Sequence, residues 1–177
     1  ENNEQLKFLT TDLTKNKLHH NIDWTIIFFH RPFYPAGEQD PSEMSETYHP
    51  IFEKLDVDLV LQGHSHNYQR TYPLLYNDAK PSEPIVDDIE KIEYHDPNGI
   101  IFVTAGTGGE SVHSVNKRPF LVSAHEGYGC INVEIKGKVI DVEFYSDTNN
   151  TIDEFSITKD HYSKDTDFYR IDDESTK

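Results

Sequence analysis

Apolar residues recur every three or four positions in two parts of the chain. In the first part they are Leu6, Leu9 and Leu13, and in the second they are Tyr48, Ile51, Phe52 and Leu55. This spacing predicts two helices, one from Gln5 to about Lys15 and one around residues 48–55, each with one buried face. A polar loop rich in Pro, Gly and Glu, from Pro35 to Ser45, precedes the second helix.

Three short runs of aliphatic, β-branched and aromatic residues predict strands buried on both faces. They are Trp24–Phe29, Val57–Leu61 and Ile100–Thr104. The first two runs flank the second predicted helix, so strand, helix and strand make a βαβ unit. The fold class is therefore α/β.

The last third of the chain predicts antiparallel strands. Gly129–Ile135 and Val139–Tyr145 flank a Lys-Gly-Lys turn, which indicates a hairpin, and Ile152–Ile157 adds a last strand. Between the two halves lies the segment Asn77–Asn98. Its Pro-rich and acidic composition predicts a long, partly disordered surface loop. Residues 159–177 mix charges with few apolar side chains, so they predict a frayed acidic tail after a domain that spans residues 1–158.

Charge limits the kinds of partner. The 177 residues contain 16 Lys and Arg against 32 Asp and Glu, a net charge of −16. This field repels nucleic acids and anionic membranes, so we expect neither as a partner. No apolar run approaches the roughly 20 residues that cross a bilayer, and the first residues show no export signal. The single cysteine, Cys130, excludes an internal disulfide.

The chemistry is carried by histidines at predicted strand ends. Gly63–His66 reads Gly-His-Ser-His directly after the second predicted strand, and side chains two residues apart point the same way on a strand. Neutral imidazole is a preferred ligand of transition metals, although two exposed loop histidines are the plain alternative. His30 ends the neighbouring strand, where ligands of open α/β sheets gather. His30, His64 and His66 are therefore the candidate metal ligands.

These residues belong to three motifs that occur in order. The motifs are His30–Tyr34 (His-Arg-Pro-Phe-Tyr), Val57–Arg70 with the Gly-His-Ser-His segment, and Phe102–Gly109 with its glycine turn, followed by Gly127–Gly129 and two strands. Together they resemble the calcineurin-like metallophosphoesterases, and most of all the purple acid phosphatase branch. The resemblance covers about residues 5–158. It implies the C-terminal half of an αββα sandwich.

The resemblance also implies a reaction and its metal ions. His30 and His64 would bind one ion and His66 the other, with a carboxylate bridging the pair, and the reaction would be phosphoester hydrolysis, with a phosphomonoester as the expected substrate. In the purple acid phosphatases one ion is ferric and its partner is iron, zinc or manganese. The resemblance is compatible with a secreted or extracytoplasmic protein, but the sequence leaves the location open.

The upstream motifs of the family are missing from this sequence. Relatives carry Gly-Asp and Gly-Asn-His motifs that supply carboxylate, amide and histidine groups, and neither Gly-Asp nor Gly-Asn occurs here. The chain is therefore expected to be the C-terminal half of a longer enzyme, inactive by itself, which binds its N-terminal half or self-associates. The alternative is a non-catalytic binding or interaction module, or an inactive fragment, that retains the fold.

The remaining candidates each have a plain alternative. Tyr68 and Arg70 would support the histidine loop, or be a buried ring and a surface arginine. His49 would face a substrate, or lie on the surface of an amphipathic helix. The glycines of Gly106–Gly109 would offer N–H groups to phosphate, or make a turn. We expect the acidic segment Asp87–Asp96 to be a solvated surface rather than a divalent-ion site. We expect His113 and His125 to be ordinary loop residues.

Overall fold

The computed structural model describes residues 2–19, 21–37 and 44–160. Its helices are α1 (Asn2–Lys17) and α2 (Met44–Lys54). Its strands are β1 (Ile26–Phe29), β2 (Leu59–Gln62), β3 (Tyr68–Thr71), β4 (Leu74–Leu75), β5 (Ile85–Val86), β6 (Glu93–His95), β7 (Ile101–Ala105), β8 (Leu121–His125), β9 (Gly129–Lys136), β10 (Val139–Ser146) and β11 (Thr151–Thr158). Neither helix is long and apolar enough to cross a membrane.

The strands form two main sheets and one small one. The five-stranded sheet has the order β1-β2-β7-β3-β8, and β1, β2 and β7 run parallel. The four-stranded sheet has the order β6-β11-β10-β9, in which β9, β10 and β11 are antiparallel. β4 and β5 pair separately. The predicted βαβ unit, the β9–β10 hairpin and the last strand are all confirmed.

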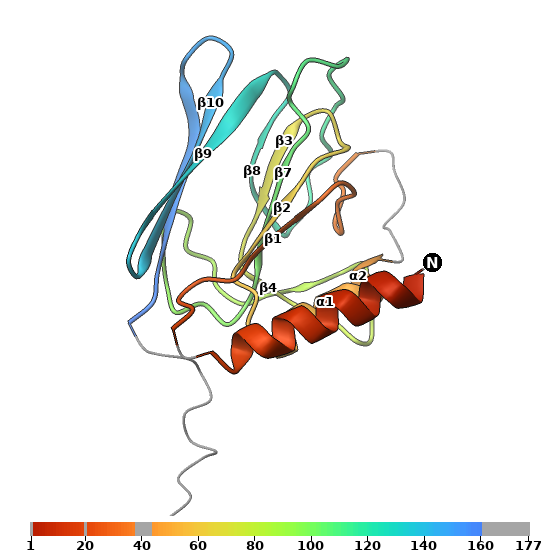
Figure 1. Ribbon diagram of the computed structural model, residues 1–177. Coiled ribbons are helices and arrows are strands. Elements are labelled where there is room, and N and C mark those ends of the chain that lie inside the picture. The colour runs from red at the N-terminus through yellow and green to blue at the C-terminus, as the bar shows by residue number, and fades with distance from the viewer. Residues whose placement is uncertain (1, 20, 38–43, 161–177) are drawn as a thin grey trace, which may run out of the picture.

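The elements are arranged in three layers. Figure 1 shows the two helices on one side of the five-stranded sheet and the β9–β10 hairpin on the other. One apolar core lies between helices and sheet and includes Leu13 of α1, Phe52 of α2 and Phe102 of β7. A second core lies between the two sheets and includes Leu59 of β2 and Phe144 of β10. The architecture agrees with the C-terminal half of a metallophosphoesterase sandwich.

A buried ion pair joins the two sheets. Arg70 of β3 is 1% exposed, and its Nε and Nη2 donate to the two carboxylate oxygens of Asp153 on β11, at 2.6 and 2.8 Å. The hydroxyl of Tyr68 donates to the same carboxylate at 2.7 Å, and Nη1 of Arg70 donates to the Tyr94 hydroxyl at 2.9 Å. This network satisfies the buried charge on both sides, as a low-dielectric interior requires.

Two parts of the chain differ from the sequence-based expectation. β1 is not buried on both faces, because the Phe28 side chain is 80% exposed. The segment Asn77–Asn98 contains two short strands, and Tyr94 in β6 is buried between Arg70 and Phe155. Such short strands have too few residues to show the alternation of apolar and polar side chains that predicts a strand. Their side chains are buried by contacts with distant parts of the chain.

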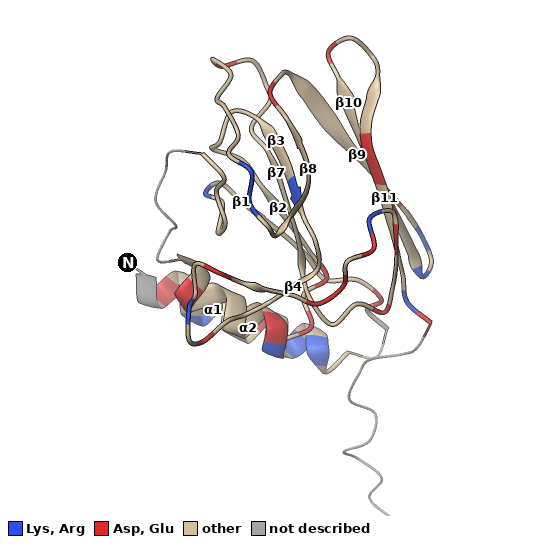
Figure 2. Ribbon diagram, turned by 180° about the vertical axis from the view of Figure 1, so that it is seen from behind, with Lys and Arg blue, Asp and Glu red and all other residues tan. Residues whose placement is uncertain are grey.

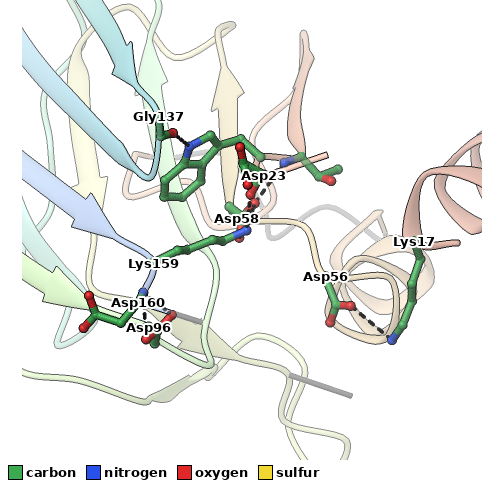
Figure 3. Close-up of polar contacts among 10 residues, drawn as sticks. Lys17, Asp23, Asp56, Asp58, Asp96, Gly137, Lys159 and Asp160 are labelled. Atoms are coloured by element: carbon green, nitrogen blue, oxygen red, sulfur yellow. Dashed lines mark hydrogen bonds and ion pairs between the residues drawn. The ribbon is translucent and has the colours of Figure 1, made fainter. Parts of the chain in front are cut away.

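The first residue of the predicted tail is fixed to the domain. Figure 3 shows Lys159 reaching toward Asp58, and its Nζ lies 2.7 Å from a carboxylate oxygen of that residue. The same Nζ lies over the Trp24 ring, 4.6 Å from its centroid. Residues 161–177 lie outside the described part of the chain. The domain described here therefore continues at least through Lys159.

We predict that the Arg70→Met substitution lowers the free energy of unfolding by about 3–5 kcal/mol, because it leaves the Asp153 carboxylate buried without its cation. Urea denaturation measures the change. The double substitution Arg70→Met with Asp153→Leu should recover most of the loss, since both charges are then gone. Lys136→Met is the control: its pair with Glu134 is exposed, so the expected change is below about 1 kcal/mol. Equal effects of Arg70→Met and Lys136→Met would contradict the prediction.

Candidate functional site

The candidate histidines lie where two parallel strands end side by side. Phe29 of β1 is opposite Gln62 of β2, so His30 and Gly63 follow at the same level. The Gly63 N–H donates to the His30 carbonyl oxygen at 3.0 Å, which fixes the two loops against each other. The carboxyl ends of parallel strands thus form one rim.

His30 and His64 come together at this rim. The Nε2 atom of His30 lies 3.1 Å from the Nδ1 atom of His64, and the two rings meet edge to face. Two imidazole nitrogens that bind one ion at about 2.0–2.1 Å lie about 2.9–3.4 Å apart when the angle at the ion is about 90–110°. The observed separation falls in this range. The 3.1 Å contact is a hydrogen bond between the two imidazoles, and its length also suits two ligands of one transition metal.

His66 is oriented as a separate ligand would be. Its Nδ1–H donates to the carbonyl oxygen of Ser111 at 2.9 Å, and this hydrogen bond leaves Nε2 as the nitrogen with a lone pair. A hydrogen bond on the second nitrogen is the usual support of a metal-bound imidazole. His66 is also stacked on His113, with ring centroids 4.1 Å apart.

Two residues of the rim were not predicted as part of it. His113, expected to be an ordinary loop residue, lies beside His66 and its Nδ1 accepts from the His66 backbone N–H at 3.4 Å. Glu110 is exposed, and the pKa of its carboxyl is lowered by hydrogen bonding to Ser111 and then by the nearby His66 charge. No local sequence pattern marks either residue as part of the site. Both lie in a loop about 45 positions after His66 along the chain, and only the fold brings this loop to the rim.

The backbone around the histidines is constrained. His64 has a φ of 64°, a left-handed conformation that is uncommon for residues other than glycine and is often found at functional sites. Gly106 touches the loop so closely that a Cβ atom would lie 2.1 Å from the Ser65 carbonyl oxygen. The Asn67 side chain donates to the carbonyl oxygens of His113 and Ser114. The segment 63–67 is therefore held from both sides.

Electrostatics favour the neutral form of His64. Its pKa is lowered, first by desolvation and then by the positive charges of His30, Arg31, His66 and His113 around it. A neutral imidazole keeps the lone pair that a metal ion needs. Figure 2 shows Asp and Glu on the helices and on the strands of the four-stranded sheet.

Tyr68 and Arg70 have their partners away from the rim. Both side chains bind Asp153 in the network between the sheets. Arg70 is therefore buried, and the alternative that it is a surface arginine is wrong. Support for the histidine loop comes instead from Asn67, whose Oδ1 accepts from Nε2 of Gln69 at 2.7 Å.

His49 is neither on the helix surface nor open to a substrate. It is fully buried, its Nε2–H donates to the Leu74 carbonyl oxygen at 3.2 Å, and its Nδ1 accepts from the Tyr34 hydroxyl at 2.6 Å. Burial lowers its pKa to about 4, although the hydrogen bond to Leu74 opposes the shift. The structure makes it a neutral residue of the helix-side core.

The other candidates also have structural partners. The Thr107 hydroxyl donates to the Gly129 carbonyl oxygen at 2.7 Å, so the glycine turn packs against the hairpin. The Asp87 carboxylate accepts the backbone N–H groups of Asn98 and Gly99, at 2.8 and 3.0 Å, and fixes the turn before β7. His125 belongs to β8 rather than to a loop.

The rim histidines do not form a complete metal site by themselves. Across residues 2–19, 21–37 and 44–160, no three His, Cys, Asp or Glu side chains gather closely enough to hold a metal ion. His30 and His64 are close enough to bind one ion together, and Nε2 of His66 keeps its lone pair. The remaining ligands of a four-coordinate site would have to come from elsewhere.

The comparisons with known proteins agree with the fold and the motifs. The calcineurin-like phosphoesterase family model matches residues 1–68. Purple acid phosphatase 18 of Arabidopsis thaliana is 30% identical over 109 residues, which cover 60% of this chain and 21% of that protein. Human acid phosphatase type 7 is 26% identical over 162 residues, covering 81% of this chain and 36% of that protein.

A solved structure shares the architecture. The purple acid phosphatase PPD1 from yellow lupin (Lupinus luteus) seeds superposes with a TM-score of 0.73 at 23% identity, over 89% of this chain and 28% of that one. The chain is thus similar to the calcineurin-like phosphoesterases over its first 68 residues, and to purple acid phosphatases over a larger part of its length. It spans well under half the length of these relatives.

We predict that stability falls in acid because of His49. Its pKa is about 4 in the folded chain and about 6.5 when unfolded, so the unfolded state binds more protons between these values. The stabilisation is present above pH 6.5 and is lost as the pH falls toward 4. Unfolding by urea at pH 7.5 and 4.5 should show a loss of about 2–3 kcal/mol that is absent in His49→Gln. An unchanged pH dependence in that variant would contradict the assignment.

Proposed function

We propose that this chain supplies the histidine ligands of a two-metal centre that hydrolyses phosphoesters, with phosphomonoesters as the substrate class in view of the acid phosphatases among its relatives. The observation that carries the proposal is the 3.1 Å separation between the ring nitrogens of His30 and His64. The chain's family supports hydrolysis as the reaction class.

Each histidine has a defined part in the proposed centre. His30 and His64 hold one ion between Nε2 and Nδ1, and His66 offers Nε2 to the second ion while Ser111 fixes its ring. When bound, two ions of this kind, iron with iron, zinc or manganese, lower the pKa of a water nucleophile and neutralise charge on the phosphoryl group. The histidine loops hold the ligands rigidly, because Gly106 and Asn67 prevent the segment from shifting.

The net charge affects how a substrate is bound. With a net charge of −16, the chain as a whole repels a phosphate group. Cations bound at the rim would reverse that repulsion locally. We therefore expect the chain to bind phosphate only when it has bound metal ions, so that removing the metal also removes phosphate binding.

A non-catalytic module is the second candidate function. It is favoured by the observation that no group of three ligands gathers in the described residues. The two functions differ in metal binding, because a module that had lost the chemistry would not need to keep two histidine nitrogens at ligand spacing.

We predict that the chain binds Zn²⁺ at His30 and His64. Isothermal titration calorimetry at pH 7.5 should show affinity that falls about tenfold or more in His30→Ala and in His64→Ala, since each removes one of two ligands. The exposed His19 provides a matched control, and His19→Ala should bind as the original chain does. Binding that survives both rim substitutions, or that depends on His125, would refute the ligand assignment.

We also predict that the chain as given does not hydrolyse a chromogenic phosphomonoester with manganese, zinc or iron above a metal-only control. The reason is the shortage of ligands: two histidines on one ion and a single histidine on the other leave both ions without the carboxylates of a dinuclear site. Turnover that disappears in both His64→Ala and His66→Ala would show that additional ligands are dispensable.

A further inference from the structure

His113 lies at the rim but has no part in the proposed metal centre. It belongs to the loop between β7 and β8, and its ring is stacked on the ring of His66, with centroids 4.1 Å apart and planes 22° from parallel. Two imidazoles in such contact have all their atoms within a few ångströms of each other. The His113 ring is therefore close to Nε2 of His66, the nitrogen that keeps a lone pair for an ion.

Hydrogen bonds fix the loop of His113 against the histidine loop. The His113 N–H donates to the His66 carbonyl oxygen at 2.9 Å, and the His113 carbonyl oxygen accepts from Nδ2 of Asn67 at 3.2 Å. Two residues earlier, the Ser111 carbonyl oxygen accepts from Nδ1 of His66 at 2.9 Å. The two loops thus hold each other, so the position of the His113 ring is set before any ligand arrives.

The side-chain hydrogen bond of His113 determines which of its ring nitrogens carries a proton. Its Nδ1 accepts from the His66 backbone N–H at 3.4 Å, so the lone pair is on Nδ1 and the proton of the neutral ring is on Nε2. Within the described part of the chain, the interactions of His113 leave this Nε2–H without an acceptor. The residue is only half-buried. His113 therefore presents an accessible hydrogen-bond donor at the rim.

The two stacked histidines have opposite tautomers. His66 carries its proton on Nδ1 and keeps the Nε2 lone pair, which suits a cation, whereas His113 carries its proton on Nε2, which suits an anion. A protonated Nε2 cannot bind a metal ion, so His113 is not a further ligand in this form. The pair thus combines a nitrogen for an ion with a donor for the anion that the ion attracts.

We propose that His113 is a substrate-binding residue whose Nε2–H donates to a phosphoryl oxygen of a phosphoester bound by the rim ions. The inference deepens the proposed function and rests on it. A donor that is already in place strengthens the binding of an anion without the cost of rearrangement. Such a donor matters in this chain, because its net charge of −16 opposes the approach of phosphate.

The substitution His113→Phe separates hydrogen-bond donation from stacking, because phenylalanine keeps an aromatic ring beside His66 but has no N–H. The probe is inorganic phosphate, titrated into the zinc-loaded chain by isothermal titration calorimetry. We expect the phosphate affinity to fall about tenfold or more, since a hydrogen bond to a charged group is lost. The zinc affinity should stay within about twofold of the original, because no proposed ligand is removed.

Two further variants complete the titration. His113→Gln should retain most of the phosphate affinity, because its side-chain amide also provides an N–H donor. His95→Phe is the matched control, since His95 is exposed on β6 in the other main sheet, and it should change neither affinity. Nitrogen-15 NMR of the metal-free chain checks the tautomer of His113 without any ligand, and the proton should be on Nε2.

Each failure has a distinct meaning. A proton on Nδ1 of His113 overturns the inference whatever the metal does. Zinc binding without phosphate binding, or with a phosphate affinity that His113→Phe leaves unchanged, overturns it and leaves the metal ligands standing. A zinc affinity that falls together with the phosphate affinity in His113→Phe would make His113 a support of His66 instead. An original chain that binds no zinc refutes the metal centre, and the inference falls with it.

Discussion

Three parallel strands end at one level in this protein, because Phe29 lies opposite Gln62 and Gln62 lies opposite Thr104. The loops that follow these strands are therefore neighbours, and the residues with metal-binding chemistry are in them. A slip of one residue in this register would turn the alternating side chains to the other face and separate the rim. The site exists because the core on each side of the sheet fixes the register.

The two cores have different kinds of support. The helix-side core is a cluster of aromatic rings around Phe33, Phe52 and Phe102, in which His49 is buried in the neutral form. The core between the sheets also contains the Arg70–Asp153 pair, whose geometry requires β3 and β11 to stay in place. On β1 the Phe28 side chain, on the face toward the second sheet, is 80% exposed.

Strong periodicity made much of the fold predictable. The two helices, the parallel strands and the β9–β10 hairpin each carry several apolar residues at the period of their structure. β3, β4, β5, β6 and β8 were not predicted, because they are short or polar and gain their burial from neighbours. Tyr68, for example, is fully buried by stacking on Phe144 of the opposite sheet.

The sequence by itself determined the α/β class, the resemblance to the calcineurin-like phosphoesterases and the identity of the histidines next to strand ends, since all three depend on local pattern or motif. Only the tertiary structure decided which histidines meet. His30 and His64 face each other, His113 stacks on His66, and His49 lies in the core. These outcomes depend on contacts between residues from 15 to 47 positions apart. The energy of such contacts comes from packing and desolvation, which a local pattern of residues does not encode.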